Sequence, residues 1–172
     1  VLNLYRKVTG KNNGKVTVSV SSFVPKAHSA FQWAPQCSIE EIERKQQYIK
    51  GLIRDKHISY HYHDARTGRM EAAFARGDRR LGKVLYYAWK KGCKFDGWTE
   101  MFDYDKWNES FADAGLEVDY FASRQRGEKE PFPWDHMSAG VAKAYLLNEW
   151  KKAHDEELTD DCRRKRCTGC GV

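Results

Sequence analysis

Two stretches of alternating apolar and polar residues predict β-strands in the first third of the chain. Residues 16–23 read VTVSVSSF, with β-branched or aromatic side chains between small polar ones. Asn12, Asn13 and Gly14 before this stretch are typical of a turn, and Pro25 after it removes a backbone donor. Residues 57–63 alternate in the same way, which predicts a second strand.

The segment between these strands has the pattern of a capped helix. Ser38 and Glu41 match a capping box, in which the serine hydroxyl caps the helix and the glutamate reaches back. Isoleucine and leucine then recur near helical spacing up to about Arg54. Strand, helix and strand together predict one right-handed α/β unit, the repeat from which parallel barrels are built.

The remainder of the chain has helical periodicity. Residues 70–75 and 81–89 predict two helices, Asp105 is expected to cap a third, and Ser138 is expected to start the last one. We therefore expect an α/β segment over residues 1–64, a helical region over 65–155 and a cysteine-rich basic tail over 156–172. Residues 123–130 form a charged loop before Pro131.

Composition excludes several classes of protein. In 172 residues, 41% are hydrophobic and 13% aromatic, which suffices for a buried core. No apolar run approaches the roughly 20 residues of a membrane span, and the start lacks both a signal-peptide layout and a Met. These features predict a cytoplasmic fragment or processed chain with no membrane partner. The net charge of +6 permits an anionic partner such as RNA or a phosphorylated cofactor.

Three cysteines near the end of the chain are the sharpest candidate for metal binding. Cys162, Cys167 and Cys170 have the spacing C-x4-C-x2-C, with glycines beside the last one. Such thiolates could hold zinc or an auxiliary iron–sulfur cluster, both of which normally have four ligands. The candidates for the fourth ligand are His154, Cys93, Cys37 or a residue beyond Val172. The alternative is a flexible, reduced tail.

Other polar groups have both a structural and a chemical interpretation. The run of cations over residues 163–166 could favour thiolates or hold a phosphate backbone, or it could be a solvated turn. His61 and His63 share one strand face, where they could bind a metal or be half-buried structural residues. Asp135 beside His136 is more often a helix cap than a catalytic partner. The sequence contains no C-x3-C-x2-C, G-x-G-x-x-G, P-loop or G-x-S-x-G motif.

Four segments resemble one known family. They are VSVSSFVPKAHSAFQWAPQ (18–36), EAAFARGDRRLGKVLYYAWKKGCKFDGW (71–98), PWDHMSAGVAKAYLLNEWKKA (133–153) and DCRRKRCTGCGV (161–172). They are similar to the late part of a radical S-adenosylmethionine (SAM) family with an N-terminal cobalamin-binding-type domain. The chain departs from the family at Ala27, Ser29 and Ala30, and it lacks the cysteine that commonly follows CGV there.

The resemblance implies the C-terminal portion of a partial (β/α)6 barrel, followed by a mainly helical segment. In the family, a C-x3-C-x2-C loop outside this region holds a [4Fe–4S] cluster that binds SAM and cleaves it reductively. The cofactor-side residues implied here lie near the SAM adenine and are Ser21, Ser22, Phe23 and Val24. The loop residues implied to face the substrate are Lys26, His28, Phe31 and Trp33.

Two functions are therefore expected as alternatives. In the first, the chain supplies late barrel strands and substrate-side loops to the rest of a radical SAM iron–sulfur enzyme, and it is not competent alone. In the second, it is an RNA- or ribosome-binding module with a metal-stabilised basic knuckle. The partner is accordingly the remainder of the parent barrel, RNA or a protein substrate. A helical interaction domain without a site of its own is the third interpretation.

Overall fold

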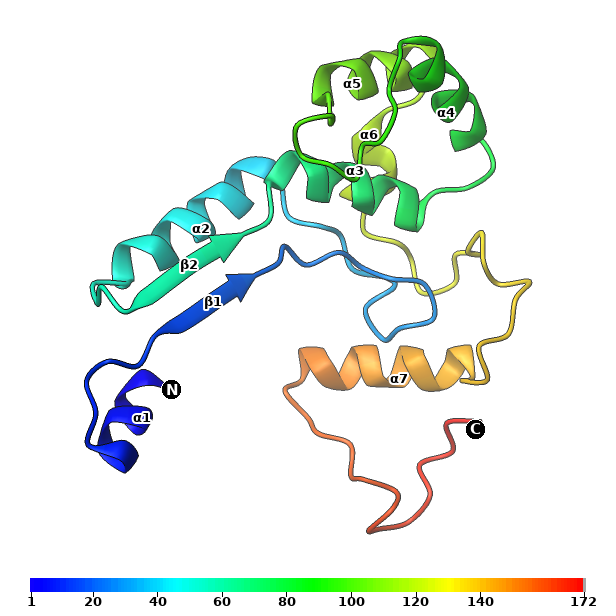
Figure 1. Cartoon of the computed structure of the whole chain (residues 1–172). Coiled ribbons are helices and arrows are strands. Elements are labelled where there is room, and N and C mark those ends of the chain that lie inside the picture. Colours follow the sequence, from blue (N-terminus) through cyan, green and yellow to red (C-terminus); the bar gives the residue numbers. More distant parts are fainter. Residues whose placement is uncertain (172) are drawn as a thin grey trace. The chain divides into compact units, whose positions relative to one another are not determined.

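The computed structural model describes residues 1–171 (Figure 1). Nine elements follow one another along these residues: α1 (Leu2–Thr9), β1 (Val16–Val20), α2 (Ile39–Leu52), β2 (Ile58–Tyr62), α3 (Ala65–Arg76), α4 (Leu81–Lys90), α5 (Tyr104–Asp113), α6 (Val118–Ala122) and α7 (Lys143–His154). They form two compact units. The first contains residues 1–23 and 37–68, and the second contains residues 24–36 and the chain from Arg69 onward.

The first unit is a strand–helix–strand motif. β1 and β2 pair in parallel, with Val18 opposite Tyr60, and α2 runs back alongside them (Figure 1). The side chain of Gln46 on α2 donates a hydrogen bond of 2.8 Å to the carbonyl of His63 after β2. In β1 the valines are half-buried and the intervening residues exposed, which confirms the predicted alternation. Helix α1 was not predicted from the sequence.

The expected partial (β/α)6 barrel is wrong. The described residues contain one sheet, and it has only two strands. From Ala65 onward the apolar residues recur at helical spacing, and this part of the chain folds as five helices joined by loops. A single strand–helix–strand unit is a building block of many α/β folds, so its presence does not predict closure into a barrel.

Helix starts follow local capping chemistry only in part. Ser38 caps α2 as predicted, because its Oγ accepts a hydrogen bond from the backbone N–H of Glu41 at 3.2 Å. The Glu41 carboxylate does not complete the capping box but pairs with Arg44 at 2.7 Å. α5 is capped by Asp103 rather than Asp105, since Asp103 lies one residue before the first helical turn.

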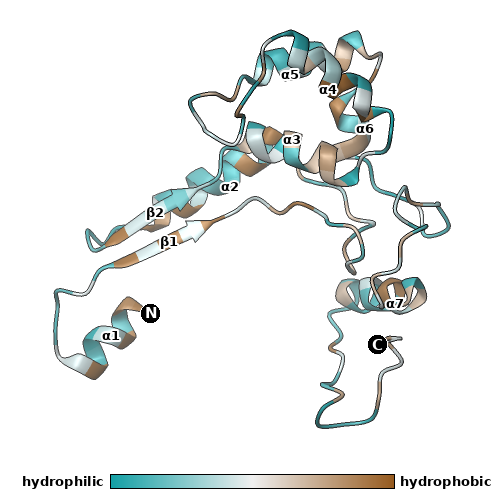
Figure 2. Cartoon of the chain, turned by 45° about the vertical axis from the view of Figure 1, so that its right-hand side comes forward, coloured by the Kyte–Doolittle hydropathy of each residue, from teal (hydrophilic) through white to brown (hydrophobic). Residues whose placement is uncertain are grey.

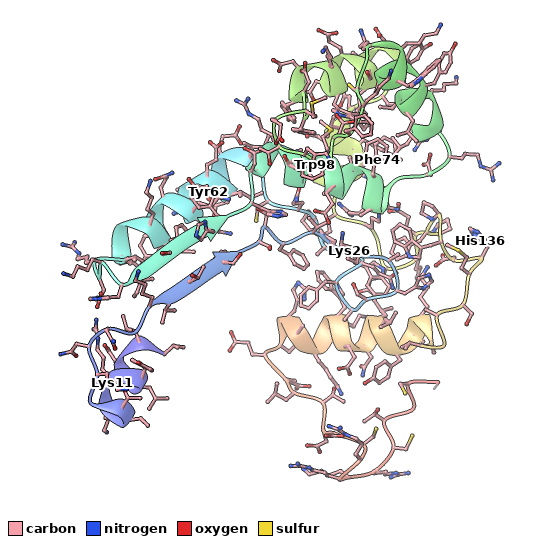
Figure 3. All side chains as sticks on the ribbon, in the orientation of Figure 1. Lys11, Lys26, Tyr62, Phe74, Trp98 and His136 are labelled. Atoms are coloured by element: carbon pink, nitrogen blue, oxygen red, sulfur yellow. The ribbon has the colours of Figure 1, made fainter. Side chains whose placement is uncertain are left out.

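Two clusters of buried side chains form the interior of the second unit. One lies among α3 to α6, where Phe74 packs edge-on against Trp107 and Phe111 with ring centroids 5.4 and 6.1 Å apart (Figure 3). The other joins the 24–36 loop to α7 and to the segment before it. Its members are Trp33, Ala34, Phe132, Trp134, Leu146 and Trp150. Among residues 1–171, every helix falls short of the length and apolar character needed to cross a bilayer.

Gly77, between α3 and α4, is expected to be intolerant of a side chain. A Cβ there would lie 2.0 Å from Leu81 Cδ1 and 2.9 Å from the carbonyl oxygen of Ala73. Gly77→Ala should therefore lower the free energy of unfolding by about 1–3 kcal/mol, measured by urea denaturation. Gly82→Ala is the matched control, because open space surrounds that position and alanine favours a helix. Equal stability of the two variants would contradict the close packing at Gly77.

Candidate functional site

A small groove lies in the first unit, beside the carboxyl end of β1. Its volume is about 190 Å³. The residues that line it come from the end of β1 and from one side of α2: Val20, Ser21, Ser22, Phe23, Cys37, Ile42, Lys45, Gln46 and Ile49. In parallel α/β proteins, ligands bind outside the carboxyl ends of strands, because the loops there are free to carry polar groups.

The groove combines an apolar wall with one unsatisfied polar atom. Val20, Ile42 and Ile49 supply aliphatic surface. The Oγ of Ser22 is buried and has no hydrogen-bond partner. A buried hydroxyl without a partner is costly, and a ligand that hydrogen-bonds to it would remove that cost. The groove therefore offers an apolar wall, with the Ser22 hydroxyl as its unsatisfied hydrogen-bonding group.

A cation lies at the rim of the groove. Lys45 Nζ is 3.3 Å from a carboxylate oxygen of Glu41 and 3.5 Å from Cys37 Sγ. The hydrogen bond to Glu41, followed by the interactions with Cys37, raises the pKa of Lys45 above its ordinary value. Hydrogen bonds from Arg44 and Lys45 in turn lower the pKa of Glu41 to about 2. Lys45 therefore stays positively charged at neutral pH, beside an exposed thiol.

The four residues expected beside the adenine do not all line the groove. Ser21, Ser22 and Phe23 do, and they belong to the first unit. Val24 belongs to the second unit, where it packs against the cluster formed by α3 to α6. The chain path therefore divides this predicted group between two units after Phe23.

The four loop residues expected to face a substrate have contacts within the second unit. Lys26 forms an ion pair of 2.5 Å with Glu71. Phe31 packs edge-on against Trp150, with centroids 5.5 Å apart. Trp33 is only 1% exposed and lies in the core.

His28 has a left-handed backbone conformation (φ 55°), and its N–H donates to the side-chain oxygen of Gln32. His28 and Gln32 also line a further cavity of about 490 Å³, beside Asp135 and Lys143.

The three tail cysteines are not gathered around a common point. Cys162 and Cys167 are exposed, and the Cys167 Sγ accepts a hydrogen bond from the N–H of Gly169 at 3.5 Å. The Cys170 carbonyl accepts a hydrogen bond from Ala142, next to α7. Among residues 1–171, no three His, Cys, Asp or Glu side chains cluster as metal ligands would. Metal binding at the tail, by zinc or by an iron–sulfur cluster, stays a prediction.

The cations in the tail are partly neutralised. Arg163 pairs with Asp161 at 2.7 Å and Lys165 pairs with Asp160 at 2.9 Å. Figure 2 shows this turn as strongly hydrophilic. The RNA-binding interpretation of the tail stays a prediction as well.

The remaining histidine candidates lie apart from the groove lining. His61 and His63 are exposed at the end of β2. Asp135 accepts a hydrogen bond from the N–H of Phe132 at 2.8 Å and pairs with Lys143 at 2.6 Å. Asp135 therefore fixes a turn before α7 rather than capping that helix, whose N-cap is Ala142.

Sequence reasoning missed a group of buried arginines in the second unit. Arg76 and Arg126 are 1% and 6% exposed, and Arg124 is half-buried. Part of this group could have been suspected from the charged loop of residues 123–130. Arg124 and Arg126 lie there two positions apart, a few residues before aromatic residues that are buried in the structure. Arg76 could not be assigned to the same group from its position in the sequence.

Comparisons with known proteins leave the family open. No family model matches the chain, and no solved structure matches it significantly. An uncharacterized protein of Methanocaldococcus jannaschii is 28% identical over 120 residues. This similarity covers 67% of the chain but only 26% of the relative, so the chain spans about a quarter of the length of the protein that it matches.

Proposed function

We propose that this chain is part of a radical SAM enzyme and that the groove beside β1 receives the adenine end of SAM. The observation that carries this proposal is the unsatisfied Ser22 hydroxyl in an apolar groove at the carboxyl end of a parallel strand. The resemblance of residues 18–36 to a radical SAM family implies that Ser21, Ser22, Phe23 and Val24 lie near the adenine, and the first three of these line the groove. The proposal does not require a barrel.

The residues present fit an adenine ring. Val20, Ile42 and Ile49 offer a surface for the faces of the purine, and the Ser22 hydroxyl can donate to or accept from its edge. A volume of about 190 Å³ is below the roughly 300–1,000 Å³ of complete ligand sites, so the groove accommodates only part of SAM. The other contacts would come from a part of the enzyme that carries the cluster motif.

The residues that line the groove would not carry out the cleavage of SAM themselves. In such an enzyme a [4Fe–4S] cluster would supply the electron for the reductive cleavage of SAM, and this chain contains no C-x3-C-x2-C motif to hold that cluster. The role of this chain is to bind and orient: the aliphatic wall excludes water from the adenine, and Ser22 fixes its rotation. The proposal therefore concerns ligand binding, which can be measured without turnover.

Titration of the ¹⁵N-labelled chain with SAM, followed by NMR, tests the proposal. We expect chemical-shift changes confined to the end of β1 and to α2. Ser22→Ala should weaken binding about fivefold, because a neutral hydrogen bond contributes about 1 kcal/mol. Ser19→Ala is the control, since Ser19 is exposed on β1 and lies outside the groove. Binding that is unchanged in Ser22→Ala, or shifts that avoid the groove, would overturn the proposal.

A second test concerns the gene. The natural reading frame that contains this chain should also encode a C-x3-C-x2-C motif. Sequencing that frame from its start codon checks the expectation directly, and a frame without such a motif would exclude a radical SAM enzyme, whatever the groove binds.

A further inference from the structure

A larger pocket lies wholly within the second unit and is separate from the groove. It has a volume of about 690 Å³ and is formed by the turn between α3 and α4, the end of α6 and the loop before α7. The residues that give it its chemical character are Arg79, Arg80, Arg124, Arg126, Tyr120 and Trp134. Figure 3 labels His136, which also lines it.

Arginines outnumber carboxylates around this pocket. Asp78 neutralises Arg80 through an ion pair of 2.8 Å. Arg79 has no ion pair among residues 1–171 and is exposed to the pocket. Glu130 is shared, because it pairs with Arg124 at 2.6 Å and lies 3.7 Å from Arg126.

Arg76 is a buried neighbour of the lining residues Ala75 and Gly77, and its hydrogen-bond partners are uncharged. Its two terminal nitrogens donate to the carbonyls of Ala122 and Arg124, the latter at 2.6 Å. Arg126 donates to the carbonyl of Arg76 itself. Arg76 and Arg126 are therefore both buried and held by backbone carbonyls, and the one carboxylate printed near Arg126, that of Glu130, is shared with Arg124.

Three donors in this cluster lack a partner. The Nε atoms of Arg76, Arg124 and Arg126 are buried without a hydrogen bond. Burial, followed by repulsion from Arg126 and Arg124, lowers the pKa of Arg76 to about 10, and burial also lowers the pKa of Arg126. Buried charge of one sign is costly unless an opposite charge is supplied, and arginine binds phosphate oxygens in a fixed, forked geometry.

Two aromatic residues of the pocket lining, Tyr120 and Trp134, contact these arginines. The guanidinium of Arg124 lies 4.8 Å from the ring centre of Tyr120, and that of Arg126 lies 5.2 Å from the ring centre of Trp134. These cation–π contacts help to hold the two arginine side chains in place. The volume falls within the range of complete ligand sites.

We propose that this pocket binds a small phosphorylated ligand of about the size of a nucleotide, with Arg79 at its mouth contacting the phosphate. The excess of arginine provides the attraction, and the cavity provides room for the organic part. This site is independent of the groove beside β1, so the two proposals can fail separately.

Isothermal titration of the full chain with ADP, pyrophosphate and adenosine tests the pocket. We expect ADP and pyrophosphate to bind and adenosine to bind much more weakly. Arg79→Glu should weaken ADP binding at least tenfold, because it removes a charge-assisted contact to the phosphate and adds repulsion. The Arg79 side chain is exposed and forms no hydrogen bond or ion pair within the described chain, so its replacement should leave the fold intact.

The control is Lys83→Glu, which makes the same charge reversal at an exposed position of α4 outside the pocket. Equal ADP affinity in wild type and Arg79→Glu, or no binding of ADP and pyrophosphate at millimolar concentration, would overturn the proposal. A single-stranded RNA that binds far more tightly than ADP and loses affinity in Arg79→Glu would assign the pocket to RNA instead and overturn the small-ligand proposal.

Discussion

Replacing Trp33 with alanine is expected to lower the free energy of unfolding by about 3–5 kcal/mol, the cost of removing a buried aromatic residue from a core. The side chain is 1% exposed, and its ring centroid lies 5.5 Å from that of Phe132. Its backbone carbonyl accepts a hydrogen bond from the N–H of Arg126 at 3.1 Å. Loss of the indole should therefore loosen both the 24–36 loop and the loop before α7. Urea denaturation followed by far-ultraviolet circular dichroism measures the change.

Two variants separate core packing from other effects at Trp33. Trp33→Phe should cost only about 1–2 kcal/mol, because the ring volume is largely kept and the buried Nε1 has no partner to lose. Trp98→Ala should change stability by less than about 0.5 kcal/mol, since Trp98 is 62% exposed (Figure 3). If Trp33→Ala were no more destabilising than Trp98→Ala, Trp33 would not be a core residue and its predicted role beside a substrate would regain support.

The second large effect is expected at Glu130. Its carboxylate forms two hydrogen bonds with Arg124, at 2.6 and 2.8 Å, and it also lies 3.7 Å from the buried Arg126. The hydrogen bond from Arg124 is the main cause that lowers the pKa of Glu130 to about 2. Glu130→Gln should lower the free energy of unfolding at pH 7 by about 3 kcal/mol, which corresponds to this pKa shift.

The pH dependence of this difference follows from the direction of the shift. Because the pKa of Glu130 is lower in the folded state, its contribution is complete above its ordinary pKa and is lost as the pH falls toward 2. The gap between wild type and Glu130→Gln should therefore shrink to about 1.5 kcal/mol at pH 3. Denaturation at pH 7 and pH 3 measures it.

Glu128→Gln is the control for charge in the same loop. Glu128 is about half exposed and pairs with Lys151 on the surface, so its replacement should cost less than about 1 kcal/mol. A difference between wild type and Glu130→Gln that stays the same at both pH values would show that Glu130 acts through packing and not through its charge.

Local chemistry determined much of the first unit. The alternation in β1 depends on which face of a strand each residue occupies, and the start of α2 depends on Ser38 and a backbone N–H three residues later. Both are interactions between near neighbours in the sequence. The same patterns could not determine how many strands would pair, because one strand–helix–strand unit is compatible with a barrel and with a two-stranded sheet.

The residues of the candidate sites were likewise identified partly from the sequence and partly only from the structure. The sequence, through its resemblance to a known family, singled out Ser21, Ser22 and Phe23, and the structure places them along one groove. It could not distinguish a Trp33 beside a ligand from a Trp33 in a core, because an aromatic residue in a loop is compatible with both. It also could not join Arg76 to Arg126, which are 50 positions apart. Only the tertiary structure decided those two points, because burial and long-range hydrogen bonding depend on which distant segments the folded chain brings into contact.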